Sequence, residues 1–351
     1  MNILGKVVFL CLVSVNVCFL TEASSGQRKQ YAMYVWRNGF DPNIPGCGKS
    51  EFLTWDSKHS HCFTHTWNTA GKRQWLWATC NLQGREVSSI FLADVYHKLK
   101  TGYQANSCHS SNINLLRTTL LEGHSHVSNL KIYALFAASD ADVSERHMIP
   151  YVVWYNDHCT HTNLEKFDGV AVNNEAYASI KCSHDIDQRR TFLDHLQEIH
   201  DEAQKQQDGN LLTHFSVSWH WGRCGGHSQP FLWRGKTMDA SHHMIDIFDS
   251  IDVQVGYTIF PQIRDRMEMA GRNYSSTLRK NIFVTFYTDK TEPCQITFFP
   301  QNCHLNGRSE SNLFSIIDQF PQNGLGQEQP CIHYFRGVYS SGGNEDWPVH
   351  L

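Results

Sequence analysis

The run from Phe167 to Glu175 ends in two residues whose types and spacing could perform chemistry. It is apolar and β-branched until Val172, which predicts a buried strand. It then finishes in Asn173, Asn174 and Glu175. Side chains two positions apart on a strand point to the same face, so the amide of Asn173 and the carboxyl of Glu175 are predicted to converge. Such a pair could cleave a glycosidic bond.

Eight short runs rich in Val, Ile, Phe or Tyr recur along the chain and indicate strands. They are Tyr31 to Trp36, Val87 to Val95, Leu130 to Ala137, Phe167 to Val172, Phe215 to Trp219, Ile251 to Tyr257, Ile282 to Tyr287 and Ile332 to Tyr339. Most are continuous rather than alternating, which is typical of parallel strands buried on both faces.

Helical spacing appears between these runs, and strands that alternate with helices indicate a parallel sheet. The helical faces are Leu115, Leu116, Thr119 and Leu120; Phe192, Leu196 and Ile199 after a cap at Asp187; Met244, Ile245 and Phe248 after Ser241; and Leu313, Ile316 and Ile317. Eight such units predict an α/β fold with a single (β/α)8 TIM-type barrel. Its active site would lie at the carboxyl ends of the strands.

A doubly wound open sheet is the alternative fold. It often carries a Gly-rich phosphate-binding turn after its first strand. Here the first run continues into Arg37-Asn38-Gly39-Phe40-Asp41-Pro42, which lacks the G-x-G-x-x-G spacing. The sequence therefore favours the barrel.

The first 23 residues have the pattern of a secretory signal peptide, with one Lys, an apolar run from Val7 to Leu20 and small residues from Ala23. We expect a secreted, extracellular protein whose barrel spans 27–351, with a signal anchor as the alternative. No later segment reaches the roughly 20 apolar residues of a membrane helix. The formal net charge of −4 and the lack of a basic run argue against nucleic acid or a membrane surface as partners.

Ten cysteines remain after the signal segment, and an oxidising compartment favours full disulfide pairing with a connectivity that the sequence leaves open. They are Cys47, Cys62, Cys80, Cys108, Cys159, Cys182, Cys224, Cys294, Cys303 and Cys331. The sequon at Asn273 predicts a glycosylation site. The long connection from Arg37 to Glu86 holds three of the cysteines, and we expect a disulfide-tied loop on the catalytic face.

The Asp168-Gly169 pair followed by Asn173 and Glu175 resembles the fourth-strand signature of chitinase-like glycoside hydrolases of family eighteen. That signature has three acidic positions at alternate residues, of which only Glu175 is kept, because Ala171 and Asn173 occupy the other two. The motif is still more similar to that of the endo-β-N-acetylglucosaminidases of family eighty-five, which place an Asn two residues before the catalytic Glu. The run ending in Tyr257 stands where chitinase-like proteins have a sixth strand with a catalytic-site Tyr.

The resemblance implies retaining, substrate-assisted hydrolysis of glycans that contain N-acetylglucosamine, with a carbohydrate or glycoprotein as substrate and no cofactor. Glu175 would be the acid and base, with its pKa raised by a partly apolar pocket. Asn173 would hold the acetamido group, and Tyr257 would donate a hydrogen bond to it. The structural alternative is that Glu175 caps a helix or pairs with Arg189 or Arg190, while Asn173 and Asn174 form an ordinary turn.

Tryptophans at predicted strand ends could stack on sugar rings. Trp36, Trp219 and Trp221 are the candidates for substrate binding, and core packing is the alternative for each. Asp168 is expected to support the strand through backbone hydrogen bonds.

Histidines are frequent, but we predict no metal site, because their neighbouring cysteines are expected in disulfides. His59, His61 and His65 surround Cys62, while His158 and His161 flank Cys159; His220, His242 and His243 are candidate helpers near the pocket. Two other functions stay open. One is a secreted glycan-binding or matrix protein that has lost catalysis, and the other is unrelated, metal-assisted enzyme chemistry on the same barrel.

Overall fold

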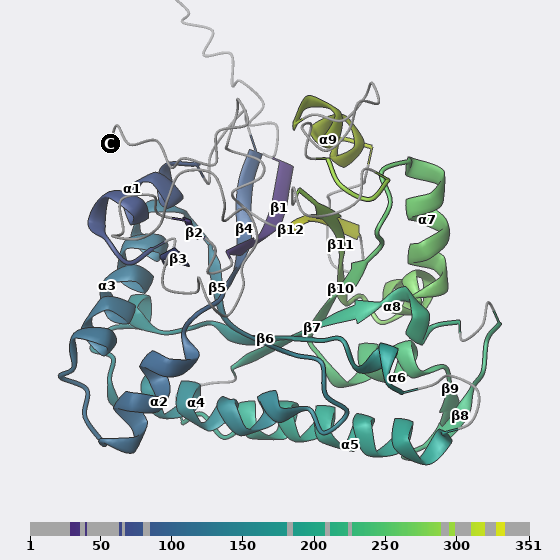
Figure 1. Ribbon diagram of the computed structural model, residues 1–351, viewed down its shortest axis with the longest axis horizontal. Coiled ribbons are helices and arrows are strands. Elements are labelled where there is room, and N and C mark those ends of the chain that lie inside the picture. Colours follow the sequence, from purple (N-terminus) through teal and green to yellow (C-terminus); the bar gives the residue numbers. More distant parts are fainter. Residues whose placement is uncertain are drawn as a thin grey trace, which may run out of the picture.

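Eight parallel strands close into a barrel in the computed structural model (Figure 1). The structure describes residues 29–35, 39–40, 63–64, 67–79, 85–180, 185–207, 211–223, 227–288, 295–298, 310–319 and 328–333. The strands are β1 (Lys29–Val35), β4 (Arg85–Leu92), β5 (Lys131–Ala138), β6 (Gly169–Asn174), β7 (Leu212–Ser218), β10 (Ser250–Gln254), β11 (Asn281–Tyr287) and β12 (Glu328–His333). They follow one another around the barrel in chain order, with β12 paired to β1. This confirms the predicted (β/α)8 barrel.

Helices surround the strands, with α5 along the lower edge of the view and α7 at its right (Figure 1). They are α1 (Ala70–Thr79), α2 (Tyr96–Gln104), α3 (Ser111–His126), α4 (Ile149–His158), α5 (Ile186–Ala203), α6 (Ala240–Ile247), α7 (Phe260–Met269), α8 (Arg272–Thr277) and α9 (Glu310–Ile317). Short 3₁₀ turns are η3 (Ser144–Met148), η4 (Asn163–Glu165), η5 (Ala176–Ala178) and η6 (Trp219–Trp221). None of the described helices combines the length and apolar character needed to cross a membrane.

The excursion after β1 contains more structure than a loop. Its described parts are β2 (Gly39–Phe40) paired with β3 (Phe63–Thr64), followed by α1. Helix α1 packs beside α3, where Arg73 pairs with Glu122 at 2.8 Å, and the rings of Trp67 and Trp77 are buried. The excursion therefore supplies a crossover helix of the barrel. Cys47, Cys62 and Cys80 lie outside the described residues.

The strands on one side of the barrel alternate rather than being apolar throughout. In β10, Ile251 and Val253 join the apolar core, whereas Asp252 is hydrogen-bonded at 2.6 Å to Tyr34 of β1. Because β1 and β10 are not neighbours in the sheet, this bond crosses the barrel interior. The prediction of continuous apolar strands was therefore wrong for β10, since its alternate positions line a polar interior.

Strands β6 and β10 are each preceded by an Asp that follows a Phe. The carboxyl of this Asp accepts a backbone N–H near the start of the neighbouring strand. Asp168 accepts the backbone N–H of Ile132 at 2.8 Å, and Asp249 accepts that of Thr213 at 2.8 Å. The expected backbone role of Asp168 is thus confirmed. The next residue, Gly169, is required for close packing, because a Cβ there would lie 2.4 Å from the ring of Tyr133.

Candidate site at the mouth of the barrel

We call the carboxyl ends of β6, β7 and β10, with the residues that directly follow them, the mouth of the barrel. Glu175 lies there and its side chain is exposed. Its backbone N–H donates to the carbonyl of Ala138 at 3.1 Å, but its side chain makes no capping bond to η5 and has no hydrogen bond or ion pair within the described part of the chain. Arg189 instead bonds Gln229, and Arg190 bonds Asp187. The structural alternatives for Glu175 are therefore contradicted.

The backbone at Glu175 departs from the prediction in one respect. Strand β6 ends at Asn174, and Glu175 has φ −98° and ψ 30°, outside the extended region. Strand alternation therefore does not fix the direction of this side chain. Its exposure also differs from the partly apolar pocket that was expected around the acid.

Asn173 is buried, with 7% of its surface exposed. Its Oδ1 accepts a hydrogen bond from Nε2 of Gln254 at 2.8 Å. The same Nε2 donates to Oγ of Ser216 at 3.0 Å. The motif residue is thus joined to β7 and β10 and is not an isolated turn residue.

Asn174 points away from Asn173 and holds a buried carboxyl behind the site. Its Nδ2 donates to the two carboxyl oxygens of Glu145 at 3.2 and 3.0 Å, and its Oδ1 accepts the N–H of Ala176 at 2.9 Å. Burial raises the pKa of Glu145 to about 7, and the hydrogen bond from Asn174 only partly opposes this. A titratable group therefore supports the turn that carries Glu175.

Aromatic rings and one guanidinium stack across the mouth. The ring of Tyr177 lies 5.5 Å from that of His220, which lies 3.7 Å from that of Trp219. Cζ of Arg266 lies 3.4 Å from the centroid of Trp219, and its Nη2 donates to the hydroxyl of Tyr257 at 2.9 Å. Burial, and secondarily the charge of Arg266, lowers the pKa of His220. His220 therefore lies at the mouth, as expected.

This stack includes Trp219, one of the tryptophans predicted to bind sugar. Arg266 and His220 both contact its indole, at 3.4 and 3.7 Å, so a sugar that stacks on Trp219 would compete with these two groups. Trp221 is only 2% exposed and stacks on Phe192, so its predicted sugar contact is wrong and core packing holds. Trp36 lies outside the described residues.

The sequence prediction missed a buried polar network around Asp252, which is fully buried. Its carboxyl accepts hydrogen bonds from Tyr34 at 2.6 Å, His214 at 2.9 Å and Ser216 at 3.0 Å, and from Thr285. The signal in the sequence was the alternation of Ser250, Asp252 and Gln254 within an apolar strand. Through Ser216 and Gln254 this network reaches Asn173.

One predicted disulfide is present, between Cys108 and Cys159. Cys331 is a buried free thiol, so the prediction that it forms a disulfide is wrong. Its side chain packs in the apolar cluster inside the barrel, whereas Cys108 and Cys159 are bonded to each other. Cys182, Cys224, Cys294 and Cys303 lie outside the described residues, as does the signal segment. Asn273 is exposed on α8, where its side chain bonds Glu268.

The described histidines for which a metal or helper role was considered contact other groups. His158 contacts the backbone of Trp154, and His161 contacts Arg117. His242 stacks on Tyr274, away from the mouth, and His243 contacts the backbone of Phe231. In the described residues no three His, Cys, Asp or Glu side chains gather as a metal site. His59, His61 and His65 are outside them.

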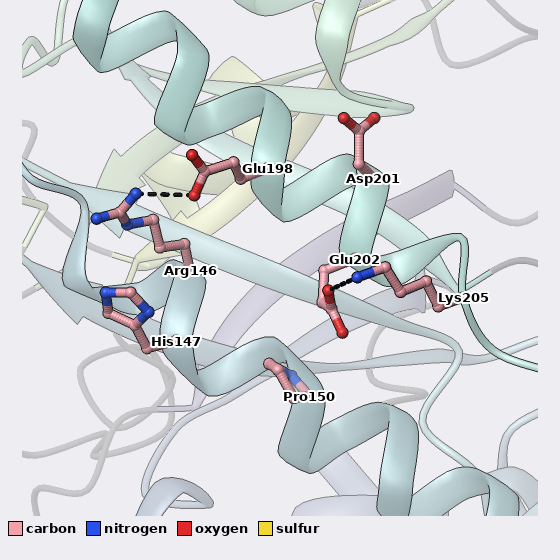
Figure 2. Close-up of a pocket in the computed structure, with 7 residues that line it drawn as sticks. All are labelled: Arg146, His147, Pro150, Glu198, Asp201, Glu202 and Lys205. Atoms are coloured by element: carbon pink, nitrogen blue, oxygen red, sulfur yellow. Dashed lines mark hydrogen bonds and ion pairs between the residues drawn. The ribbon is translucent and has the colours of Figure 1, made fainter.

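A separate pocket of about 410 Å³ lies on the outer helices, between η3, the start of α4 and α5 (Figure 2). Its lining residues are Arg146, His147, Pro150, Glu198, Asp201, Glu202 and Lys205. Arg146 pairs with Glu198, and Lys205 with Glu202. Because both cations of this pocket are paired with its own carboxylates and none of the lining residues belongs to the mouth, we assign the site to the mouth.

The fold and the site define a (β/α)8 barrel protein with a carboxylate and two amides at the carboxyl ends of its strands. The chain matches no protein-family model and no curated protein. It is similar to solved structures of a GH18 chitinase from Pseudoalteromonas aurantia (14% identity, 68% of this chain and 79% of that one, TM-score 0.37). A chitinase from Bacteroides thetaiotaomicron is also similar (12% identity, 74% and 68%, TM-score 0.35).

A third similar structure is a xylanase and amylase inhibitor protein, at 10% identity over 87% of this chain and 92% of that one, with a TM-score of 0.37. These likenesses concern the fold alone.

Proposed function

We propose that the protein is a secreted glycosidase that hydrolyses glycans containing N-acetylglucosamine at the mouth of its barrel, with Glu175 as acid and base. The observation that carries this proposal is the unpartnered carboxyl of Glu175. A carboxylate at the end of a strand usually pairs with a cation or caps a helix, and this one does neither among the described residues. It is free to protonate a leaving oxygen.

The reaction would proceed without an enzyme nucleophile. The acetamido oxygen of the sugar attacks the anomeric carbon while Glu175 protonates the glycosidic oxygen, and the same carboxylate then activates water. The amides of Asn173 and Gln254, joined at 2.8 Å, would hold the acetamido group. Tyr257 keeps its own O–H as a donor, because its oxygen accepts from Arg266.

The Glu175→Gln substitution tests this proposal. It keeps the shape of the side chain and removes the proton donor, so release of reducing ends from chitin oligomers or N-glycans should fall at least 100-fold. The control is Glu202→Gln on α5, whose carboxyl pairs with Lys205 on the outside and should be silent. Equal activity of the Glu175→Gln variant and the control would contradict the assignment.

Glycan binding without hydrolysis is the second candidate. It is favoured by Ala171, which fills one acidic position of the resembling motif with a fully buried methyl group. In that case the unmodified protein would bind the glycans and release no reducing ends. Isothermal titration beside a reducing-end assay separates the two candidates.

A further inference from the structure

A directed chain of hydrogen bonds links the centre of the barrel to the motif residue Asn173. Ser216 donates to Oδ2 of Asp252 at 3.0 Å, Gln254 donates to Ser216 at 3.0 Å, and the same nitrogen of Gln254 donates to Asn173 at 2.8 Å. All three bonds are buried. Their direction decides which atoms of the two amides remain for a ligand.

The carboxylate of Asp252 sets that direction. An ionised carboxylate only accepts, at about four sites, and here four donors surround it. Ser216 therefore donates its hydroxyl hydrogen to Asp252, and in its contact with Gln254 the oxygen of Ser216 must be the acceptor. Gln254 must then present its NH₂ group to Ser216, and Asn173, which meets the same nitrogen, must present its carbonyl oxygen.

The outer ends of the two amides have no partner within the described residues. These are Nδ2 of Asn173 and Oε1 of Gln254. Neither atom belongs to the fully buried polar atoms that lack a hydrogen bond, so each atom keeps some exposure to solvent and a ligand can reach it. Residue 173 thus offers a donor at the mouth, and residue 254 offers an acceptor.

We propose that Gln254, rather than Asn173, accepts the acetamido N–H of the ligand and is the residue that selects N-acetylated sugars. This rests on the proposed function and deepens it. An N–H requires an oxygen, and the oxygen of Asn173 is consumed by Gln254. As the acetamido oxygen attacks, its nitrogen gains positive charge, which the carbonyl dipole of Gln254 would stabilise. Asp252 and Ser216 are positioning residues.

The test uses the Glu175→Gln protein, which should bind without turnover. Calorimetry compares tetra-N-acetylchitotetraose with cellotetraose, a neutral tetramer that has hydroxyls in place of the acetamido groups. Gln254→Met, of similar shape, should reduce the preference for the acetylated tetramer about tenfold, the loss of one hydrogen bond. The exposed Gln262→Met on α7 is the matched control and should keep the preference.

Asn173→Asp separates the two assignments. An aspartate oxygen still accepts from Gln254, so the preference for the acetylated tetramer should persist. The proposal would be overturned if the preference for the acetylated tetramer survived Gln254→Met and was lost in Asn173→Asp. If neither tetramer binds, the proposed function fails together with this ligand assignment.

The direction of the amides has a readout that needs no ligand. Hydrogen exchange of side-chain amides by NMR, assigned with Asn173→Asp and Gln254→Glu, should show a protected Gln254 NH₂ and a fast Asn173 NH₂. The reverse order would overturn the direction of the chain, even if glycans bind and are cleaved.

Discussion

At the scale of single residues, Glu145 is the group whose ionisation acts on the candidate site. It is fully buried, and Asn174 bonds it on one side while holding Ala176 of the turn on the other. Burial raises its pKa from 4.5 to about 7, with a smaller contribution from the charge of Asp140. Ionising this carboxyl in the folded protein is therefore unfavourable, and the cost depends on pH.

Glu145→Gln is expected to remove a decline of stability with pH. Between about 4.5 and about 7 the folded state binds more protons than the unfolded state, so stability is greatest below this window and falls as pH rises through it. At roughly 1.4 kcal/mol per pKa unit, the decline is on the order of 3 kcal/mol. Urea unfolding at pH 5 and pH 8 measures it, with Glu202→Gln as control. A variant with an unchanged pH slope would contradict the assignment.

At the scale of elements, the aspartates that precede β6 and β10 join neighbouring strands at the amino-terminal end of the barrel. Besides the N–H of Ile132, Asp168 accepts from His124 of α3 at 2.8 Å and from Lys131 at 2.9 Å. Burial alone would raise the pKa of Asp168, but these hydrogen bonds outweigh it and lower the pKa. Burial alone would lower the pKa of His124, but its hydrogen bonds to Asp168 and to the backbone carbonyl of Leu164 outweigh burial and raise the pKa.

Asp168→Asn should destabilise the protein by about 2 kcal/mol near pH 6, because the charged bonds to His124 and Lys131 are lost. The contribution of Asp168 is present above its ordinary pKa and is lost as pH falls. That of His124 is present below its ordinary pKa and is lost as pH rises. The effect should therefore shrink at pH 3. Urea unfolding measures it against Asp187→Asn, whose side chain is 92% exposed. A cost that does not depend on pH would exclude this account.

The elements themselves could be predicted because their signals are local. All eight apolar runs correspond to barrel strands, although β12 begins at Glu328 rather than at Ile332. The prediction missed Asp252 as a partner of Tyr34, because only closure of the barrel joins residues 218 positions apart. The contact between Arg266 and Trp219 was missed because it joins a helix to the end of a neighbouring strand, which no local pattern shows. Asn173 and Glu175 were predictable because they stand two positions apart at the end of one apolar run, although β6 itself ends at Asn174.

At the scale of the whole molecule, the barrel is closed by a polar contact through its interior as well as by its sheet. Tyr34 of β1 donates to Asp252 of β10 at 2.6 Å, and both side chains are buried. Burial and the nearby carboxylate raise the pKa of Tyr34 well above its ordinary value, so the phenol stays a donor. A buried carboxylate is stable only while its donors are kept. The network that fixes the amides at the mouth therefore also holds opposite walls of the barrel together.

Tyr34→Phe should cost about 2–3 kcal/mol of unfolding free energy, because it leaves one acceptor site of a fully buried carboxylate without a donor. The matched control is Tyr274→Phe. Tyr274 makes a hydroxyl bond of the same 2.6 Å length to Asp246, but that carboxyl is 18% exposed, so water can replace the phenol and the cost should stay below about 1 kcal/mol. Chemical denaturation of the two variants compares the costs directly. Equal costs would mean that burial of Asp252 does not make its donors essential to the barrel.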